Sequence, residues 1–240
     1  MKKSSNERYT TGDYEKNHPD WHAEDASWKA GMVAAAMKKQ NIQPKRITEI
    51  GCGSGGILKV LAQVFPGTAA FEGFDISPRA IALAQQGASN GVYFFCDDLL
   101  QRPGYSTDLL LVLDVLEHVD DFYGMLRDIH FMSGQFIFHI PLDLSCRTLL
   151  KPHVLLEQRE RSGHVHYFSE EMVRWALHDT GFEIVEWEYT QPRIDIDPAR
   201  GLKNGVKKIL RNLSFGINRK WSVKLWGGYS ILIFANRVNA

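Results

Sequence analysis

The sequence predicts an α/β fold with a doubly wound, mostly parallel sheet. Short apolar segments of strand character alternate with amphipathic segments of helical period between Ile47 and Ile140. One of the apolar segments, Leu109–Leu113, is uninterrupted, as expected for a central strand buried on both faces. A glycine-rich turn follows the first segment, and this is a usual place for a ligand in such a sheet.

The composition is that of an ordinary globular protein. The chain has 240 residues, 44% of them hydrophobic and 23% charged, and its formal net charge is zero. The length suits one α/β domain, and the zero net charge gives no reason to expect a nucleic-acid partner. There is no C-x-x-C pair among the three cysteines, and we recognise neither a membrane-spanning run nor a signal peptide. We therefore expect a protein of the reducing cytoplasm.

Local patterns predict the elements in order. A helix from Asp20 to Gln40 precedes the sheet. The next helix covers residues 55–65, another starts with Ser77 as its cap and Pro78 in its first turn, and a third runs from Asp121 to Met132. The strands are predicted over Ile47–Gly51, Ala69–Ile76, Val92–Cys96, Leu109–Leu113 and Gln135–Ile140.

The second half of the chain has a different rhythm. We expect Pro141 to close the fifth strand and residues 142–168 to be irregular. Ser169 is placed to cap a helix that ends at Gly181. Two further strands are predicted over Phe182–Tyr189 and Tyr229–Asn236, and the segment between them, 190–227, has no strand character.

The glycine-rich turn has the sequence Glu49-Ile-Gly-Cys-Gly-Ser-Gly-Gly56. Glycines permit positive φ angles and let backbone N–H groups and a helix N-terminus approach a ligand closely. The turn fits the dinucleotide pattern G-x-G-x-x-G and also the pattern E-x-G-x-G-x-G. The turn alone therefore leaves two classes of nucleotide-binding protein open.

Acidic residues end three successive predicted strands. Asp75 lies at the end of the second strand, Asp97 and Asp98 follow the third, and Asp114 follows the fourth. A carboxylate can accept hydrogen bonds from both hydroxyls of a ribose, and an acceptor after the third strand suits an adenine amino group.

The ordered motifs resemble those of class I S-adenosylmethionine (SAM) methyltransferases, in the small-molecule subgroup with an L-E-H-V motif. They are Glu49-Ile-Gly-Cys-Gly-Ser-Gly, Phe74-Asp-Ile-Ser-Pro, Phe95-Cys-Asp-Asp-Leu and Asp114-Val-Leu-Glu-His-Val. A later segment, Gly163-His-Val-His-Tyr-Phe-Ser, is similar to one before the last helix of that subgroup. The resemblance covers roughly residues 20–190 and the final strand. It implies a seven-stranded, mostly parallel Rossmann-like sheet with strands 6 and 7 as an antiparallel hairpin at one edge.

The resemblance also implies a cofactor, SAM, with S-adenosylhomocysteine (SAH) as product. The glycines would pack against its methionyl and ribose parts, with Glu49 behind them, and Asp75 would bind the ribose. Asp97 and the Asp98 backbone would bind adenine, and the Asp114–Val115 backbone the amino group. The predicted cofactor-binding residues are Trp28, Glu49, Gly51, Cys52, Gly53, Gly55, Asp75, Ile76, Asp97, Asp98, Asp114 and Val115.

Two alternatives stay open. An NAD-dependent oxidoreductase would explain the glycines and Asp75, but not the helix before the first strand, the L-E-H-V motif or the late strands. A non-catalytic SAM-binding protein is the other. Trp28 likewise has two interpretations, as part of a flap stacked on the cofactor or of a helix that only covers the sheet edge.

The candidate catalytic residues are His164 and His166. A hydroxyl or amine acceptor must lose a proton, and histidine accepts protons near neutral pH. His164 matches the family segment and is the preferred base or acceptor ligand, with a packing role as the alternative. No metal site is predicted, because no carboxylate cluster accompanies the two histidines in the sequence. We expect His118 to have a structural or cofactor-side role and His139 to be a hydrogen-bonded core residue.

Residues 200–224 are the most individual part of the chain, with eight basic residues and no Asp or Glu. Their apolar residues recur on one narrow helical face, at Leu202, Val206, Ile209, Leu210 and Leu213. Lys203, Lys207 and Arg211 fall on the other side. This helix is either docked beside the last strand with a solvated basic face, or it is a lid. A lid would meet an anionic acceptor, or an anionic membrane surface beside a lipid-linked one.

These interpretations give one methyltransferase domain in four parts: an N-terminal helical cap (1–40), a SAM-binding core (41–189), a basic insert or lid (190–227) and the last strand (228–237). The expected reaction is methyl transfer from SAM to an oxygen or nitrogen of a small-molecule acceptor, which is anionic, sugar-linked or lipid-linked. We expect a cytoplasmic protein with possible peripheral membrane contact through 200–224, and the oligomeric state is left open.

Overall fold

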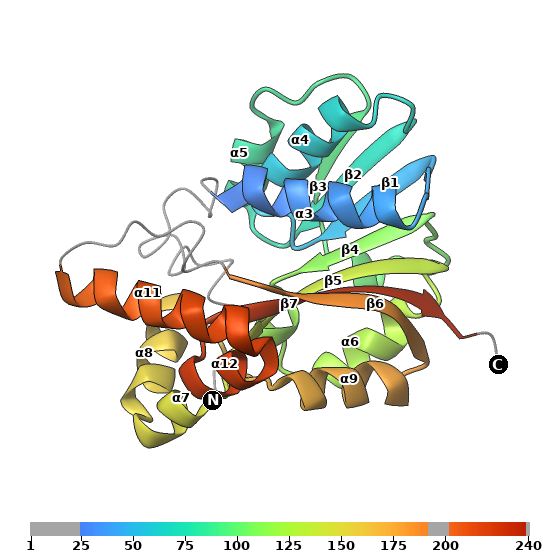
Figure 1. Cartoon of the computed structure of the whole chain (residues 1–240). Coiled ribbons are helices and arrows are strands. Elements are labelled where there is room, and N and C mark those ends of the chain that lie inside the picture. Colours follow the sequence, from blue (N-terminus) through green and yellow to red (C-terminus); the bar gives the residue numbers. More distant parts are fainter. Residues whose placement is uncertain (1–24, 192–201, 239–240) are drawn as a thin grey trace.

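A seven-stranded sheet organises the computed structural model, which describes residues 25–191 and 202–238, without the side chains of 202–207. The strand order is β3-β2-β1-β4-β5-β7-β6 (Figure 1). Strands β1 to β5 are parallel, and β7 pairs antiparallel with both β5 and β6. The predicted sheet is therefore confirmed. Its strands are β1 (Arg46–Ile50), β2 (Ala70–Asp75), β3 (Val92–Cys96), β4 (Leu109–Leu113), β5 (Gln135–Leu142), β6 (Phe182–Thr190) and β7 (Tyr229–Arg237).

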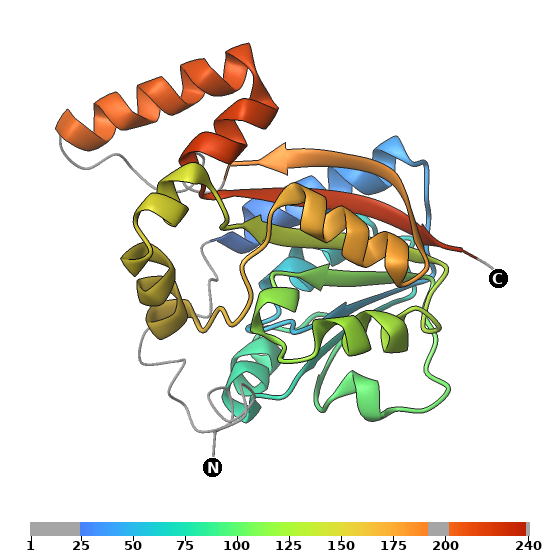
Figure 2. The ribbon, with the colours of Figure 1, turned by 90° about the horizontal axis from the view of Figure 1, so that it is seen from below.

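Helices cover both faces of the sheet (Figures 1 and 2). Helices α3 (Ala26–Lys39), α4 (Gly56–Val64) and α5 (Pro78–Gln85) supply one apolar core, which includes Val33 and Leu61. Helices α6 (Phe122–Ile129) and α9 (Glu170–Asp179) supply the other, which includes Leu126 and Leu177. Burial on both faces explains why all five residues of β4 are apolar and buried. The first residues of the helix predicted from Asp20 lie outside the described part of the chain.

The predicted helix starts are confirmed by their capping hydrogen bonds. The Ser77 hydroxyl accepts from the Ala80 N–H at 3.3 Å, with Pro78 in the first turn. The Ser169 hydroxyl accepts from the Met172 N–H at 3.3 Å. Serine is favoured here because its side-chain oxygen satisfies an N–H group that has no partner within the helix. These capping bonds fix the residues at which the two helices begin.

Two expectations for the second half are wrong. Strand β5 continues through Pro141, which pairs with Ser230 of β7. The pairing of β5 with β4 ends at His139, so the missing N–H of Pro141 interrupts no bond to β4. Residues 142–168 are not irregular throughout, because they contain α7 (Cys146–Leu150) and α8 (His153–Ser162). A reciprocal capping box between Ser145 and Thr148 starts α7.

The segment between β6 and β7 forms α11 (Leu202–Ile217) and α12 (Arg219–Trp226). Figure 2 shows α11 standing out from the side of the sheet, and α12 packs against α7. The predicted solvated position of Arg211 is wrong, because Arg211 is only 8% exposed. Its guanidinium lies 4.6 Å from the centre of the Tyr229 ring and donates a hydrogen bond to the Gly228 carbonyl. Cation–π stacking and this hydrogen bond favour the buried position. The apolar residues Ile209, Leu210 and Leu213 are exposed instead.

Among the described helices, none has the length and hydropathy required to cross a membrane. Two short 3₁₀ turns complete the fold, η2 (Leu99–Gln101) after β3 and η3 (Leu116–His118) after β4.

Candidate active site

A cavity of about 380 Å³ opens where the parallel strands β1 to β4 end. This volume is within the usual range for small-molecule sites, and the place is the expected one in a doubly wound sheet. Helix α3 and strand β5 also contribute to its wall. The predicted site residues in the wall are Glu49, Gly51, Cys52, Gly53, Asp75, Ile76, Asp97, Asp98, Asp114, Val115 and His164.

The glycine-rich turn depends on its glycines for both conformation and space. Gly51, Gly53 and Gly55 all have positive φ angles, of 68°, 52° and 72°. A Cβ atom on Gly51 would lie 2.8 Å from a methyl group of Val115, and one on Gly55 would lie 2.3 Å from the Phe94 ring. Gly51 and Gly53 border the cavity, whereas Gly55 does not and packs against Phe94. The turn therefore brings bare backbone to the cavity wall.

Asp75 holds this turn in place and still faces the cavity. Its Oδ2 accepts from the Gly53 N–H at 2.9 Å, and its Oδ1 accepts from the Ser77 N–H at 2.8 Å. Burial raises the pKa of the Asp75 carboxyl, and these two N–H donors oppose that effect. Each carboxylate oxygen has a second lone pair, so the group can also accept from two ribose hydroxyls.

The acids after β3 occupy different positions in the wall. Oδ2 of Asp97 accepts from Nε of Arg102 at 2.6 Å. The Asp98 side chain caps η2, because its Oδ1 accepts from the Leu100 N–H at 3.1 Å. Ile76 and the first residues of η2 add apolar surface between these acids and Asp75. A polar rim with an apolar floor of this kind fits a purine base.

Asp114, at the end of β4, is held on both carboxylate oxygens. Oδ1 lies 2.6 Å from Nδ1 of His139, and Oδ2 lies 2.6 Å from Nζ of Lys29. Burial alone would raise the pKa of Asp114, but the charges of His139 and Lys29 and their hydrogen bonds bring it well below its usual range. The second ring nitrogen of His139 pairs with the Thr190 hydroxyl at 2.9 Å, so His139 is the hydrogen-bonded core residue that the sequence predicts.

Helix α3 reaches the cavity with Lys29 and not with Trp28. The Trp28 ring packs edge-on against His139 at 6.0 Å between centroids, outside the cavity wall. Lys29 lies in the wall beside Glu49 and was not among the predicted site residues. It directly follows Trp28 in the helix predicted before the first strand, and this position is the signal that the sequence offers for it. Glu49 is buried and borders the cavity, and burial raises its pKa to about 8.

A second group of polar side chains, Glu117, His118 and His164, borders the same cavity. We call it the Glu117 cluster. Oε1 of Glu117 lies 3.8 Å from Nε2 of His118, and the His118 and His164 rings meet edge-on at 5.0 Å between centroids. The backbone N–H groups of Val165 and His166 donate to the Glu117 carbonyl at 2.7 and 3.1 Å. These two bonds hold the His164 loop against η3.

Asp143 orients His164 from outside the cavity wall. Its Oδ2 lies 2.7 Å from Nδ1 of His164, and its Oδ1 accepts from Nε2 of Gln158 at 2.6 Å. Burial lowers the pKa of His164, but the Asp143 hydrogen bond and the Glu117 charge outweigh it, so the pKa is raised. Asp143 was not predicted, although it directly follows β5 as Asp114 directly follows β4.

His166, the second predicted catalytic residue, lies outside the cavity wall. Its Nε2 is 3.1 Å from the carbonyl oxygen of Asp120, and its ring packs against Phe122 at 4.9 Å. The structure therefore brings His164 to the cavity and leaves His166 in a packing position.

The sequence profile of a family described as a methyltransferase domain matches residues 21–187. The chain belongs to this methyltransferase family. This family assignment favours the predicted SAM-dependent methyltransferase over the NAD-dependent alternative, and two solved structures with the same fold hold SAH or SAM.

The chain is also similar to individual proteins. Magnesium protoporphyrin IX methyltransferase (ChlM) of Synechocystis PCC 6803 with bound SAH is 22% identical at a TM-score of 0.60, covering 93% of this chain and 86% of that one. The plantazolicin methyltransferase BpumL, in complex with a monoazolic desmethylPZN analog and SAH, is 14% identical at a TM-score of 0.57, covering 95% of this chain and 89% of that one. Norajmaline N-methyltransferase of Rauvolfia serpentina is 30% identical over 112 residues, which span 41% of this chain and 38% of that protein.

Proposed function

We propose that the protein methylates an oxygen or nitrogen of a small molecule that binds between the glycine-rich turn and the Glu117 cluster. The observation that carries this proposal is that one cavity is bordered both by Asp75 and by His164. SAM supplies a methyl group on a positively charged sulfur. A lone pair of the acceptor forms the new bond to the methyl carbon, and the electron pair of the broken methyl–sulfur bond stays on sulfur in SAH.

The proposed cofactor roles follow from the hydrogen-bonding capacity that each group does not use within the protein. Asp75 retains lone pairs for the ribose hydroxyls, because the turn uses only one N–H bond per oxygen. Asp97 and the backbone of Asp98 take the adenine, and the backbone of Asp114 and Val115 takes the amino group. Lys29 neutralises the Asp114 carboxylate, so the neighbouring backbone presents its own dipoles to the ligand.

The acceptor proton goes to His164 when the acceptor is a hydroxyl or a protonated amine. Asp143 bonds to Nδ1, which makes Nε2 the ring nitrogen that accepts. Its raised pKa makes the imidazole a stronger base than free histidine. Positioning supplies much of the remaining rate, since the methyl group is already activated.

The test is a search for the acceptor with deuterium-labelled SAM. The protein is incubated with fractionated small-molecule and lipid extracts, and mass spectrometry seeks a product that carries the labelled methyl group. We expect such a product with the native protein and much less with His164→Gln. Binding of SAM without SAH formation in any fraction would instead indicate a non-catalytic SAM-binding protein.

A second proposal concerns where the acceptor is met: we infer that α11 and α12 rest on an anionic lipid surface. The docked side of α11 carries Arg211 and Ser214, whereas its apolar residues Ile209, Leu210 and Leu213 are exposed. Among the described side chains of the two helices, the exposed apolar ones are Ile209, Leu210, Leu213, Ile217, Trp221 and Leu225. Leu149 and Leu150 of α7, which packs against α12, are exposed as well.

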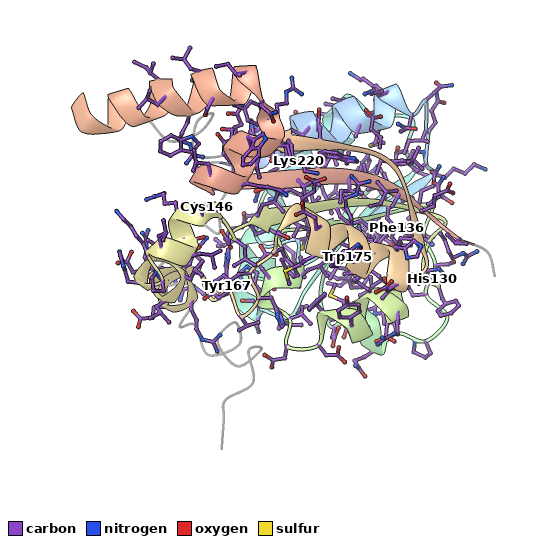
Figure 3. The ribbon with its side chains drawn as sticks, turned by 60° about the horizontal axis from the view of Figure 1, so that its bottom comes forward. His130, Phe136, Cys146, Tyr167, Trp175 and Lys220 are labelled. Atoms are coloured by element: carbon purple, nitrogen blue, oxygen red, sulfur yellow. The ribbon has the colours of Figure 1, made fainter. Side chains whose placement is uncertain are left out.

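Charge favours lipid over another apolar partner. Residues 200–224 contain only basic charges, and Figure 3 shows Lys220 on α12 above α7, which carries Cys146. Lys220 and Lys224 also contact Glu171 of α9, which anchors α12 to the body of the protein. An amphipathic helix with basic residues beside an exposed apolar face is typical of peripheral binding to anionic lipid. Co-sedimentation with anionic but not neutral vesicles is the expected result; dimerisation without vesicle binding would overturn it.

A further inference from the structure

We propose that Glu117, His118 and His164 bind a divalent first-row transition-metal ion. Each of the three side chains offers one donor atom, and these atoms all lie within 4.8 Å of one another. Donors to one such ion lie about 3–3.5 Å apart when metal–ligand bonds are about 2.1 Å long. Small side-chain rotations would therefore close the cluster around an ion.

The Glu117 carboxylate supplies the observation that points to a ligand. It is 1% exposed, borders the cavity, and its Oε2 accepts no hydrogen bond from any residue that the structure describes. A buried carboxylate oxygen without a donor is costly and uncommon in folded proteins. A bound cation would satisfy this oxygen and balance the charge of the carboxylate.

His164 is already held as metal-binding histidines are held. Its Nδ1 lies 2.7 Å from the Asp143 carboxylate, and Gln158 in turn donates to the other oxygen of Asp143. A histidine that donates one ring N–H to a carboxylate presents the lone pair of its other nitrogen to a metal in a fixed direction. The loop is pinned as well, because Val165 and His166 donate to the Glu117 carbonyl.

Two imidazoles and one carboxylate form a facial donor set that leaves coordination positions open. Since all three residues border the cavity, those positions face the space assigned to the acceptor. This inference rests on the proposed function and changes one role in it. With the ion bound, His164 is a ligand, and the acceptor hydroxyl loses its proton to solvent because coordination lowers the hydroxyl pKa.

The sequence predicted no metal because no carboxylate accompanied the late histidines. The structure places Glu117 of the L-E-H-V motif beside His164, which removes that reason. The carboxylate and His118 come from η3 after β4, whereas His164 comes from the loop before α9, so sequence spacing alone could not show the set.

The experiment is titration of the chelator-treated full-length protein with two metal ions. Visible absorption monitors the binding of Co²⁺, and calorimetry measures the binding of Zn²⁺. We expect one site per chain. Glu117→Gln and His164→Gln should weaken binding by at least about 100-fold, and Asp143→Asn by about 10- to 100-fold through loss of orientation. His178→Gln, on the exposed face of α9, is the matched control and should bind normally. Thermal unfolding and SAM calorimetry confirm that each variant is folded.

Failure of the native protein to bind Co²⁺ or Zn²⁺, or native affinity in Glu117→Gln, would overturn the metal site. The proposed methyl transfer would then stand, with His164 as base, provided that SAM still binds. Loss of SAM binding by the native protein would contradict the proposed function instead, and the metal titration would be unaffected. The two failures are therefore distinguishable.

Discussion

Nζ of Lys29 lies 2.6 Å from Oδ2 of Asp114, which ties the helix before the sheet to the end of its central strand. Asp114 has a φ of +53°, a left-handed conformation that aspartate tolerates better than most residues. His139 binds the other carboxylate oxygen at 2.6 Å, so both side-chain bonds hold this backbone turn in its unusual conformation. The turn continues into Val115, whose side chain packs on Gly51. Helix α3 therefore stabilises a turn in the wall of the cavity as well as covering the sheet.

Replacing Lys29 with Met tests this connection. Loss of a charge-assisted bond that is largely buried should lower the free energy of unfolding by about 1.5–3 kcal/mol, and SAM should bind more weakly because the Asp114 turn loosens. Chemical denaturation and calorimetry measure the two effects. Lys38→Met, on the exposed side of the same helix, is the control and should change neither. Equal behaviour of the two variants would contradict the role of Lys29.

The buried carboxyl of Glu49 predicts a pH dependence of stability. Its pKa is raised from 4.5 to about 8 in the folded protein because it is buried. Between these two pH values the unfolded chain releases this proton and the folded chain retains it, so stability falls as pH rises. The slope from this one group is at most about 1.4 kcal/mol per pH unit. Glu49→Gln should remove that slope in unfolding experiments between pH 5 and 8. An unchanged slope in the variant would show that Glu49 is not the group that titrates.

Much of the fold could be predicted because its signals are local. Leu109–Leu113, the serine caps at Ser77 and Ser169, and the acids at the strand ends all lie where the patterns place them. The continuation of β5 through Pro141 could not be predicted from the sequence, since it depends on the pairing with β4 ending before the pairing with β7. The outward apolar face of α11 was also unpredictable, because a helix normally buries that face.

The candidate site divides in the same way. Residues of the glycine-rich turn and Asp75 are encoded in one short motif each, and they reach the cavity. Lys29 and Asp143 act through side-chain pairs with Asp114 and His164, far from them in the sequence, and no local pattern encodes such pairs. His166 differs from His164 by two positions and still lies outside the cavity, because its ring packs on Phe122.

Substitution of His164 should separate chemistry from cofactor binding. With the acceptor in hand, His164→Gln should lower kcat by about 10²–10⁴ and leave SAM affinity nearly unchanged, as expected for loss of a proton acceptor. His166→Gln should lower kcat far less, because that ring lies outside the cavity wall. Steady-state kinetics and SAM calorimetry on both variants are the measurements. A native kcat in His164→Gln would return this residue to a packing role.

The exposed face of α11 should govern binding to lipid. Leu213 and Ile217 are 59% and 86% exposed, and burying such a side chain in the acyl region contributes about 1.5–3 kcal/mol. Leu213→Glu and Ile217→Glu should therefore each weaken sedimentation with anionic vesicles by about tenfold or more. Phe131→Glu, at a site that is 75% exposed on the loop after α6, should have no effect. Equal binding by all of these variants would place the lipid contact elsewhere.

SAM calorimetry on the native protein and on Asp75→Ala tests the central assignment, the cofactor site at the ends of β1 and β2, most directly. Loss of a charged acceptor for two ribose hydroxyls should cost about 2–4 kcal/mol, or roughly a 30- to 1,000-fold weaker affinity. Thermal unfolding of the variant must show a folded protein, because Asp75 also binds the Gly53 and Ser77 N–H groups. An Asp75→Ala variant that is folded and binds SAM as tightly as the native chain would contradict the account.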